Sequence, residues 1–529
     1  MPNLFLVLAT IGISTIGAAQ DFTLEAIDYA TMPMTGAVDG KGQISGLLAR
    51  VNFLREEPQS KGGRLFVNDL NGPLYILDKQ TRKFSTCLDF NGRDGRPGMF
   101  HKLPTDVGYA NGFISFAFDP AYAQNGKFYT IHLEDPAVPG SSVPDNVNFP
   151  RLNTANYSVT APIETPGPVA RESVLIEWTD TDRSNNTFEG TARELMRVQF
   201  NTRLHPMADL IFNPTAMPGD ADWRVLYIAS GDGASGESRD LQIRSNPQRL
   251  DTLVGKILRI IPDVAEHKES STISKNGRYR IPNDNPFVSK SKARPEIWAL
   301  GLRNPSRLSW DVDPKNPRSN HLISNVIGLH TWETVVFIHK GANYGYPLRE
   351  GTQTLEINNK TADLPADDRI PVQLDASTTD GLKRPIYPVI QYGHVEDGGD
   401  AVSSGFVYRG TAIPALRGKY IFGDISTGRL WYADYREMLA ADDGNPKTMA
   451  QMHSIRIRWT KTGGLSEVYG SMAPIVETAY HLRGGKAVNL PGFAMVAKPS
   501  RADIHLSVDS KGELFVLSKS DGVIRILGR

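Results

Sequence analysis

A strand–turn–strand unit that recurs along the chain constrains its fold more than any other feature. Copies start at Ile114 ("ISFAFDPAYAQNGKFYTIHLED"), Ala208, Arg307, Gly405 and Ile504, and a shorter copy starts at Gly62. From Ile114 onward the copies begin about 95–100 residues apart. In each copy an alternating apolar strand leads through a turn rich in Asp, Pro, Asn or Gly into a second strand, which indicates antiparallel sheet. Six such meanders predict an all-β fold, a six-bladed β-propeller with long inserted loops.

Three polar segments interrupt the repeats, namely Pro136–Thr165, Lys268–Arg294 and Thr352–Lys383. They are rich in turn residues, so we expect loops that project from one face and form a binding surface. A helix of one or two turns is expected from Tyr435, in "YREMLAAD". Two β-sandwiches are the rival fold, and the regular spacing argues against them. The last strand, "GVIRILGR", could close the ring with N-terminal residues.

The first residues resemble a secretory signal, because an apolar run from Leu4 leads to the small residues Gly17, Ala18 and Ala19. The alternative is a buried first strand. We therefore expect a signal peptide at 1–19, an N-terminal extension at 20–50 and the propeller at 51–529. The protein would be secreted or periplasmic. No later apolar run approaches the length of a membrane span, so none is expected in the mature chain.

The net charge limits the classes of partner that this chain could bind, and the cysteine count limits the kinds of site that it could form. Lys and Arg together number 58, as do Asp and Glu, so no net field attracts nucleic acid. A small molecule or another protein is the expected partner. The only cysteine, Cys87, excludes an intramolecular disulfide and any site built from several cysteines. We interpret it as a small buried apolar residue.

Two polar residues stand at strand ends, where a propeller has its central channel. His205, in "RLHPMADLIFNP", directly precedes a strand, and Asp232, in "YIASGDGASGES", follows one. An Asp at a sharp turn could orient a neighbouring His and raise its basicity, which is what a general base needs. Residues of these types are also common in ordinary surface loops and turns.

Arg303 and Asn304 interrupt the apolar segment "EIWALGLRNPSRLSWD". A planar guanidinium beside a carboxamide suits a ligand with carboxylate or quinone oxygens. The alternative is a structural arginine that binds carbonyls between blades. The turn "KGANYGYP" contains Asn343 and Tyr344 and could supply an aromatic wall. The chain has no P-loop, no G-x-S-x-G and no Rossmann glycine fingerprint, so a nucleotide cofactor is not expected.

Five segments, taken in order, resemble the glucose/sorbosone dehydrogenases, soluble quinoproteins that use pyrroloquinoline quinone (PQQ). They are "GFISFAFDPAYAQNGKFY", "LVGKILRIIPD", "EIWALGLRNPSRLSWD", "TWETVVFIHKGANYGYP" and "GFVYRGTAIPALRGKYIFGDISTGRLW". The resemblance covers roughly Val51 to Leu527. It implies a six-bladed propeller with PQQ over the central channel, usually with a calcium ion, for which the sequence identifies no ligands.

The resemblance also implies roles for individual residues. His205 matches the family's catalytic base and Asp232 the aspartate that supports it, while Arg303 and Asn304 match the pair at the quinone. Asn343 and Tyr344 are expected at the cofactor as well. His205 would take the anomeric hydroxyl proton of an aldose while hydride leaves C1 for the quinone, giving the lactone. An external acceptor would then take the electrons.

The chain departs from the family pattern at several positions. Met207 and Ala208 replace the glycine pair after the histidine, and Ala110 and Val326 stand where relatives often have polar residues. Besides a PQQ-dependent sugar dehydrogenase, the sequence therefore leaves open a non-catalytic propeller that binds a carbohydrate or protein ligand. A calcium-dependent lactonase is a third hypothesis, but its ligand cluster cannot be assembled from the sequence.

Overall fold

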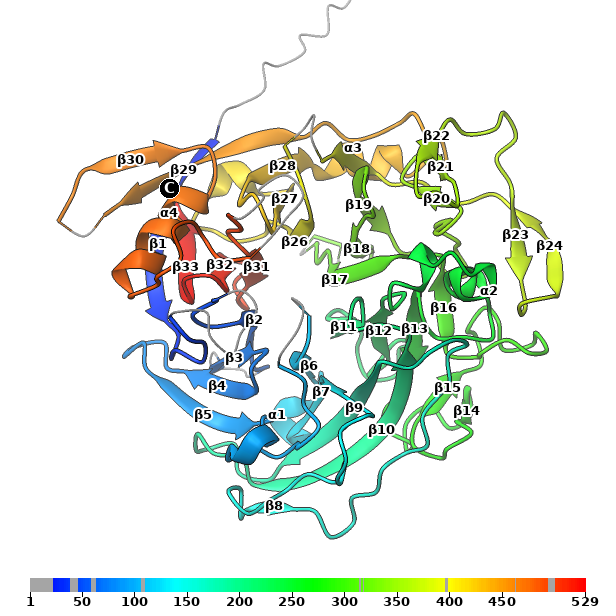
Figure 1. Ribbon diagram of the computed structural model, residues 1–529, viewed down its shortest axis with the longest axis horizontal. Coiled ribbons are helices and arrows are strands. Elements are labelled where there is room, and N and C mark those ends of the chain that lie inside the picture. Colours follow the sequence, from blue (N-terminus) through cyan, green and yellow to red (C-terminus); the bar gives the residue numbers. More distant parts are fainter. Residues whose placement is uncertain are drawn as a thin grey trace, which may run out of the picture.

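The computed structural model describes residues 22–38, 46–58, 63–105, 110–313, 315–316, 318–394, 398–461, 463–492 and 500–529. The expected signal peptide, residues 1–19, lies outside the described residues. Strands dominate the described chain and its helices are few and short, so the fold is all-β as predicted. The sheets are arranged around a common centre in a propeller-like ring (Figure 1).

Most of the strands belong to five sheets. The first holds β2 (Val51–Glu56), β3 (Leu65–Asp69), β4 (Pro73–Leu77) and β5 (Phe84–Asp89). The second holds β6 (Phe113–Phe118), β7 (Lys127–Glu134), β9 (Arg171–Asp180), β10 (Gly190–Phe200) and β8 (Leu152–Asn153). The third holds β11 (Met207–Phe212), β12 (Leu226–Ser230), β13 (Lys256–Ile260) and β16 (Ile297–Leu300). The fourth holds β17 (Asn304–Trp310), β18 (Leu322–Ile327), β19 (Trp332–Phe337) and β25 (Ile390–Gly393).

The fifth sheet joins two meanders through the N-terminal strand. It holds β26 (Val402–Val407), β27 (Lys419–Asp424), β28 (Leu430–Asp434), β29 (His453–Thr460), β30 (Ser466–Tyr469), β1 (Phe22–Thr31), β33 (Val523–Gly528), β32 (Leu514–Ser518) and β31 (Ile504–Val508). Strand β1 pairs in parallel with β29 and antiparallel with β33. The last strand therefore pairs with N-terminal residues, as the sequence suggested, and β1 lies within the region expected as an extension.

The remaining elements are short. Short strands lie in the last two inserted segments or, for β20, just before one: β14 (Ser271–Ile273), β15 (Arg280–Pro282), β20 (Arg349–Glu350), β21 (Gln353–Leu355), β22 (Thr361–Ala362), β23 (Ile370–Gln373) and β24 (Thr379–Lys383). The α-helices are α1 (Tyr122–Asn125), α2 (Leu241–Arg244), α3 (Tyr435–Ala441) and α4 (Ala473–Leu482). The helix predicted from Tyr435 is confirmed as α3, whereas α4 was not predicted. Among the described residues no helix has the length and apolar character needed to cross a membrane.

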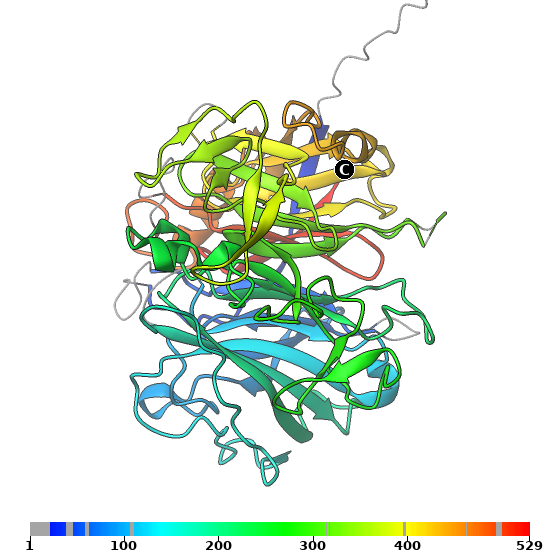
Figure 2. The same cartoon turned by 90° about the vertical axis from the view of Figure 1, so that its right-hand side faces the viewer.

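One strand of each meander faces the centre of the ring. These inner strands are β2, β6, β11, β17, β26 and β31, and each contacts the next until β31 contacts β2. The inner strand β6 is buried at every position, which explains its continuous apolar sequence "FISFAF". The outer strand β29 alternates buried and exposed residues instead. The β14–β15 and β23–β24 hairpins lie outside the ring in Figure 1, on the side of the molecule that faces the viewer in Figure 2.

The hydrophobic core lies between neighbouring sheets rather than at the centre. One cluster joins the second and third sheets through residues such as Leu175, Leu210 and Leu258. Another joins the first and fifth sheets through Leu77 and Ile524. Because apolar burial contributes roughly 25 cal/mol per Å², the sheet-to-sheet layers hold the ring together and leave the centre free for polar groups.

Candidate active site

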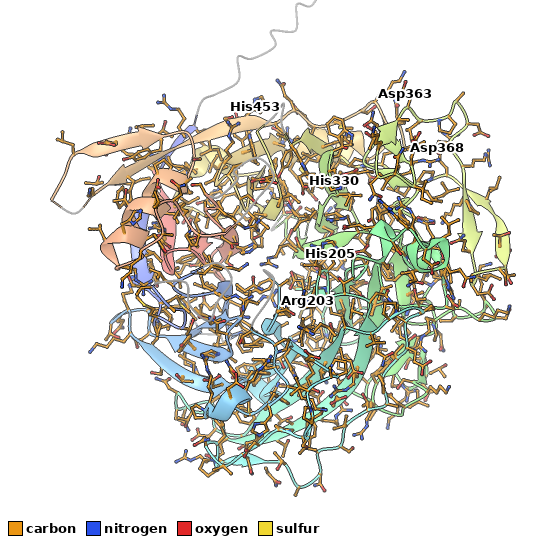
Figure 3. All side chains as sticks on the ribbon, in the orientation of Figure 1. Arg203, His205, His330, Asp363, Asp368 and His453 are labelled. Carbon is orange, nitrogen blue, oxygen red and sulfur yellow. The ribbon has the colours of Figure 1, made fainter. Side chains whose placement is uncertain are left out.

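A cavity of about 260 Å³ lies at the centre of the ring, among the first residues of the inner strands. His205, Arg303 and Asn304, which the sequence singled out, all line it. Ala110, one of the departures from the family pattern, lines it too. Figure 3 places His205 near the centre of the ring, whereas Asp363 and His453 lie at its outer edge. The ring thus brings residues from distant repeats to one cavity.

β-Bulges direct several of these side chains inward. The register shifts by one residue near the start of β2, β6, β11 and β17. The residues at the shifts are Asn52, Ile114, Ala208 and Ser306, and all four line the cavity. A bulge leaves one residue unpaired and re-aims its side chain. The second residue of β2, β6 and β11 and the third residue of β17 therefore face the channel.

His205 and Asp232 form a close pair at the cavity. Nδ1 of His205 lies 2.7 Å from Oδ1 of Asp232, and the carboxylate is fully buried. The same carboxylate accepts hydrogen bonds from the backbone N–H groups of Ala234 and Gly236, each at 3.0 Å. These bonds leave the carboxylate only one orientation toward the imidazole. Nδ1 therefore carries the proton, and Nε2 presents its lone pair, with no hydrogen bond to any described residue.

The backbone around this pair is strained and tightly packed. His205 has a φ of +48°, which L-residues rarely adopt. A Cβ at Gly231 would lie 2.4 Å from the carbonyl oxygen of His205, so only glycine fits there. The N–H of Gly233 donates to that same carbonyl at 3.0 Å. Conformations of this kind cost about 1–3 kcal/mol and cluster at functional sites.

Arg303 is joined to the same turn and is also clamped by neighbouring groups. The N–H of Asp232 donates to the Arg303 carbonyl at 2.8 Å. The guanidinium forms an ion pair with Glu237 and donates to the carbonyls of Ile327 and Gly328. Burial alone would lower the pKa of Arg303, but the Glu237 carboxylate raises it above its ordinary value. Both sequence interpretations of Arg303 thus find support, since it lines the cavity and serves as a clamp.

Asn304, Asn343 and Tyr344 occupy different surroundings. Asn304 lines the cavity, and its side chain makes no hydrogen bond to another described residue. The Asn343 amide is buried and forms two reciprocal hydrogen bonds with Gln248, at 2.7 and 3.0 Å. The Tyr344 hydroxyl donates to the Phe337 carbonyl, and Tyr344 lines a separate small cavity that Arg303 also lines. The structure therefore brings Asn304 to His205 but places Asn343 and Tyr344 apart from them.

Several cavity residues escaped the sequence reasoning. Arg307, Arg501, His505 and Lys519 line the cavity, and Lys519 Nζ lies 2.9 Å from His505 Nε2. Burial lowers the pKa of Lys519 to about 7 and that of Arg307 to about 10. Lys519 directly follows β32, the second strand of the last repeat. Asp232 lies two residues after β12, the second strand of its own repeat. That shared position in the repeat was the signal that could have identified it.

The arrangement suits proton removal from a bound molecule. Nε2 of His205 has no hydrogen bond to a described residue, and Asp232 is placed to stabilise an imidazolium. Four cationic side chains, Arg303, Arg307, Arg501 and Lys519, are among the residues that line the cavity. No group of three or more His, Cys, Asp or Glu side chains that could hold a metal occurs among the described residues. The described residues therefore offer calcium no carboxylate cluster of this size.

Sequence comparison finds a family match over the middle of the chain. The family model described as Glucose / Sorbosone dehydrogenase matches residues 196–471, just over half of the 529 residues. The match contains His205, Asp232, Arg303 and Asn304. It confirms the resemblance found in the sequence motifs.

Two curated relatives extend this result. HIPL1 protein from Arabidopsis thaliana is 29% identical over 393 residues, which are 72% of this chain and 52% of that protein. Aldose sugar dehydrogenase YliI from Escherichia coli is 38% identical over 123 residues, which are 23% of this chain and 26% of that protein. The chain thus spans about half the length of HIPL1 protein, and the segment that matches the dehydrogenase covers about a quarter of that protein.

A solved structure has the same fold. The soluble aldose sugar dehydrogenase from Escherichia coli, in its apo form, superposes with a TM-score of 0.51 at 15% identity. The superposition covers 96% of this chain and 99% of that one. At this identity the likeness concerns the fold.

Proposed function

The chain belongs to the glucose/sorbosone dehydrogenase family, and from this premise we propose that it oxidises the anomeric hydroxyl of an aldose to the lactone, with PQQ as the hydride acceptor. The observation that carries the proposal is the His205–Asp232 pair in a central cavity that Arg303 and Asn304 also line. A base, its supporting carboxylate and donors for a polar ring system thus share one cavity.

His205 is the general base of this proposal. Its Nε2 would take the proton of the anomeric hydroxyl as the C1–H bond gives up its hydride. The Asp232 carboxylate would accept a hydrogen bond from Nδ1–H throughout the reaction. This bond fixes the tautomer of His205 and stabilises the imidazolium. Help from a positioned base contributes roughly 10²- to 10⁴-fold to the rate.

The cavity fits a cofactor that carries several carboxylates. Among the described lining residues Arg303, Arg307, Arg501 and Lys519 are cationic, and Asp400 is the only carboxylate. PQQ is a planar quinone with three carboxylates, and when bound it supplies the carbon that accepts the hydride. The cations would hold its carboxylates, and the free amide of Asn304 would hydrogen-bond to a ring oxygen. We assign no residue to calcium.

Three further features belong to the same proposal. The ring comprises six blades, a number supported by the closed circle of contacts among the six inner strands. The protein acts after export, supported by the signal-like residues 1–19. The electrons leave to an external acceptor, because the cofactor must be reoxidised after each turnover.

A non-catalytic binding propeller is the second candidate, and one observation favours it. Nε, Nη1 and Nη2 of Arg303 already bind Glu237, Ile327 and Gly328, so the residue expected at the quinone is largely satisfied within the protein. Such a propeller would use the cavity to bind a carbohydrate or protein ligand without chemistry.

The deciding experiment loads the purified apo-protein with PQQ and Ca²⁺ and follows aldose-dependent reduction of an artificial electron acceptor. We expect PQQ binding in absorbance titrations and turnover with at least one aldose. PQQ binding without turnover across a panel of aldoses would favour the binding propeller. Neither binding nor turnover would remove the dehydrogenase proposal.

A further inference from the structure

Two buried polar atoms of residues that line the cavity lack hydrogen-bond partners, although Nη1 and Nη2 of Arg307 donate to Ser306 and Asn52. At the β17 bulge, Oγ of Ser306 and Nε of Arg307 are buried and have no hydrogen bond to any described residue. Both residues are more than nine-tenths buried, and both line the cavity. Leaving a buried donor unpaired costs about 1–3 kcal/mol, and more when the group is charged. Two unpaired donors on successive residues therefore point to a ligand.

The opposite wall adds a buried cation. Lys519 is 3% exposed and donates from Nζ to Nε2 of His505 at 2.9 Å. Burial and the neighbouring cations hold the pKa of His505 well below its ordinary value, so the imidazole is neutral and accepts this bond. Nζ also donates to Oδ1 of Asp503 at 3.5 Å, and this carboxylate is shared with Arg501 at 3.4 Å. One proton of the ammonium therefore remains.

Positive charge exceeds negative charge in this part of the channel. Arg307 has no carboxylate within ion-pair distance among the described residues, and its charged neighbours include the carboxylates Asp209 and Asp503 and the cations Arg55 and Lys519. Asp209 is already paired with Arg55 at 2.6 Å. Asp503 is already shared by Arg501 and Lys519. Burying an uncompensated cation is costly, so a negative ligand would stabilise the folded protein here.

We propose that Ser306, Arg307 and Lys519 form a binding site for one small monovalent anion, a halide or a carboxylate group, inside the channel. Ser306 Oγ and Arg307 Nε donate to it from β17, and the Lys519 ammonium donates from the end of β32. The occupant is either a free ion or a carboxylate of the bound cofactor, and the two share this chemistry. The free-ion form holds whether or not the protein is a dehydrogenase, and the carboxylate form rests on the proposed function.

The donor set explains why the ligand is an anion. All three groups carry protons, and Ser306 is the only one that could also accept a hydrogen bond. A metal cation would face Arg307 and Lys519 without a nearby free carboxylate. A water molecule would satisfy the donors but leave the charge excess in place. An anion would accept hydrogen bonds from the donors and would also offset the excess positive charge.

The site is tested by bromide, which scatters X-rays anomalously. Crystals of the full-length apo-protein are grown with sodium bromide, with and without PQQ. We expect an anomalous peak within hydrogen-bond distance of Arg307 Nε and Lys519 Nζ. A peak that persists with PQQ identifies a free-ion site, and a peak replaced by a PQQ carboxylate identifies a cofactor subsite. If neither bromide nor a carboxylate occupies the position, the proposal is wrong.

Variants separate a built site from an adventitious ion. Lys519→Met keeps the length of the side chain and removes its charge, and we expect bromide affinity in solution to fall about tenfold or more. Lys461→Met, at an exposed position, is the matched control and should leave affinity unchanged. Equal affinity in wild type and Lys519→Met would show an adventitious ion only and overturn the site. Because Met buries well, loss of folding is not expected; Ser306→Ala, which keeps all charges, provides a second check.

Discussion

Nδ1 of His205 lies 2.7 Å from Oδ1 of Asp232, although 27 residues separate them along the chain. The pair joins the loop before β11 to the turn after β12. Two backbone N–H groups hold the carboxylate, and a positive φ at His205 turns the imidazole toward it. This relationship is the basis of the first two predictions.

Replacing His205 should separate chemistry from binding. His205→Ala removes the group that we propose as the base for the substrate proton, so we expect kcat to fall about 10²- to 10⁴-fold. PQQ affinity, measured by absorbance titration, should change little. Full activity in this variant would show that another group is the base.

Asp232→Asn tests the role of the supporting carboxylate. Ala234 donates to Oδ1 and Gly236 to Oδ2, so the single amide oxygen of Asn can keep only one of these two hydrogen bonds, and a modest loss of melting temperature is expected. The amide cannot stabilise an imidazolium, so we expect kcat to fall by more than this loss of stability explains. An exposed Asp443→Asn variant is the control. A variant with unchanged kcat would argue against a catalytic role for the pair.

Arg303 should matter for cofactor binding. Arg303→Ala removes a charged donor from the cavity wall, and we expect PQQ affinity to fall about tenfold or more. Glu237→Gln keeps the guanidinium but weakens its internal partner, so it should retain PQQ binding. Wild-type affinity in Arg303→Ala would leave the arginine with its clamping role alone.

Lys519 should make stability depend on pH. Burial lowers its pKa from 10.5 to about 7 in the folded protein. Between these values the unfolded chain binds more protons than the folded chain, so the free energy of unfolding should rise with pH, by at most about 1.4 kcal/mol per unit.

The measurement is urea unfolding at both ends of this pH range, in a salt whose anion is too large for the channel. Lys519→Met should lack the contribution of this lysine. A wild-type pH dependence identical to that of Lys519→Met would contradict the assignment.

Strand β1 should contribute strongly to stability because it joins β29 to β33. Leu24 is 1% exposed, and Leu24→Ala should cost about 2–5 kcal/mol of unfolding free energy. Ile27 lies on the same strand but is 47% exposed, so Ile27→Ala should cost much less. Equal losses would mean that packing of β1 does not limit stability.

Local pattern in the sequence was enough to predict much of this protein. Period-2 alternation and the repeat spacing predicted the all-β fold, because strand formation and turns depend on neighbouring residues. The interpretation of the sequence as six repeats also predicted that His205, Asp232, Arg303 and Asn304 lie at strand ends. All four come together at the centre of the ring.

Only the tertiary structure decided which residues meet. The parallel pairing of β1 with β29, the Glu237 partner of Arg303 and the Gln248 partner of Asn343 all join distant segments. Arg307 and Lys519, more than 200 residues apart, share one cavity only because the ring closes. The sequence determined the strands and the chemistry at their ends. Closure of the ring determined which charges are buried together, because burial and pairing depend on long-range contacts that no local pattern records.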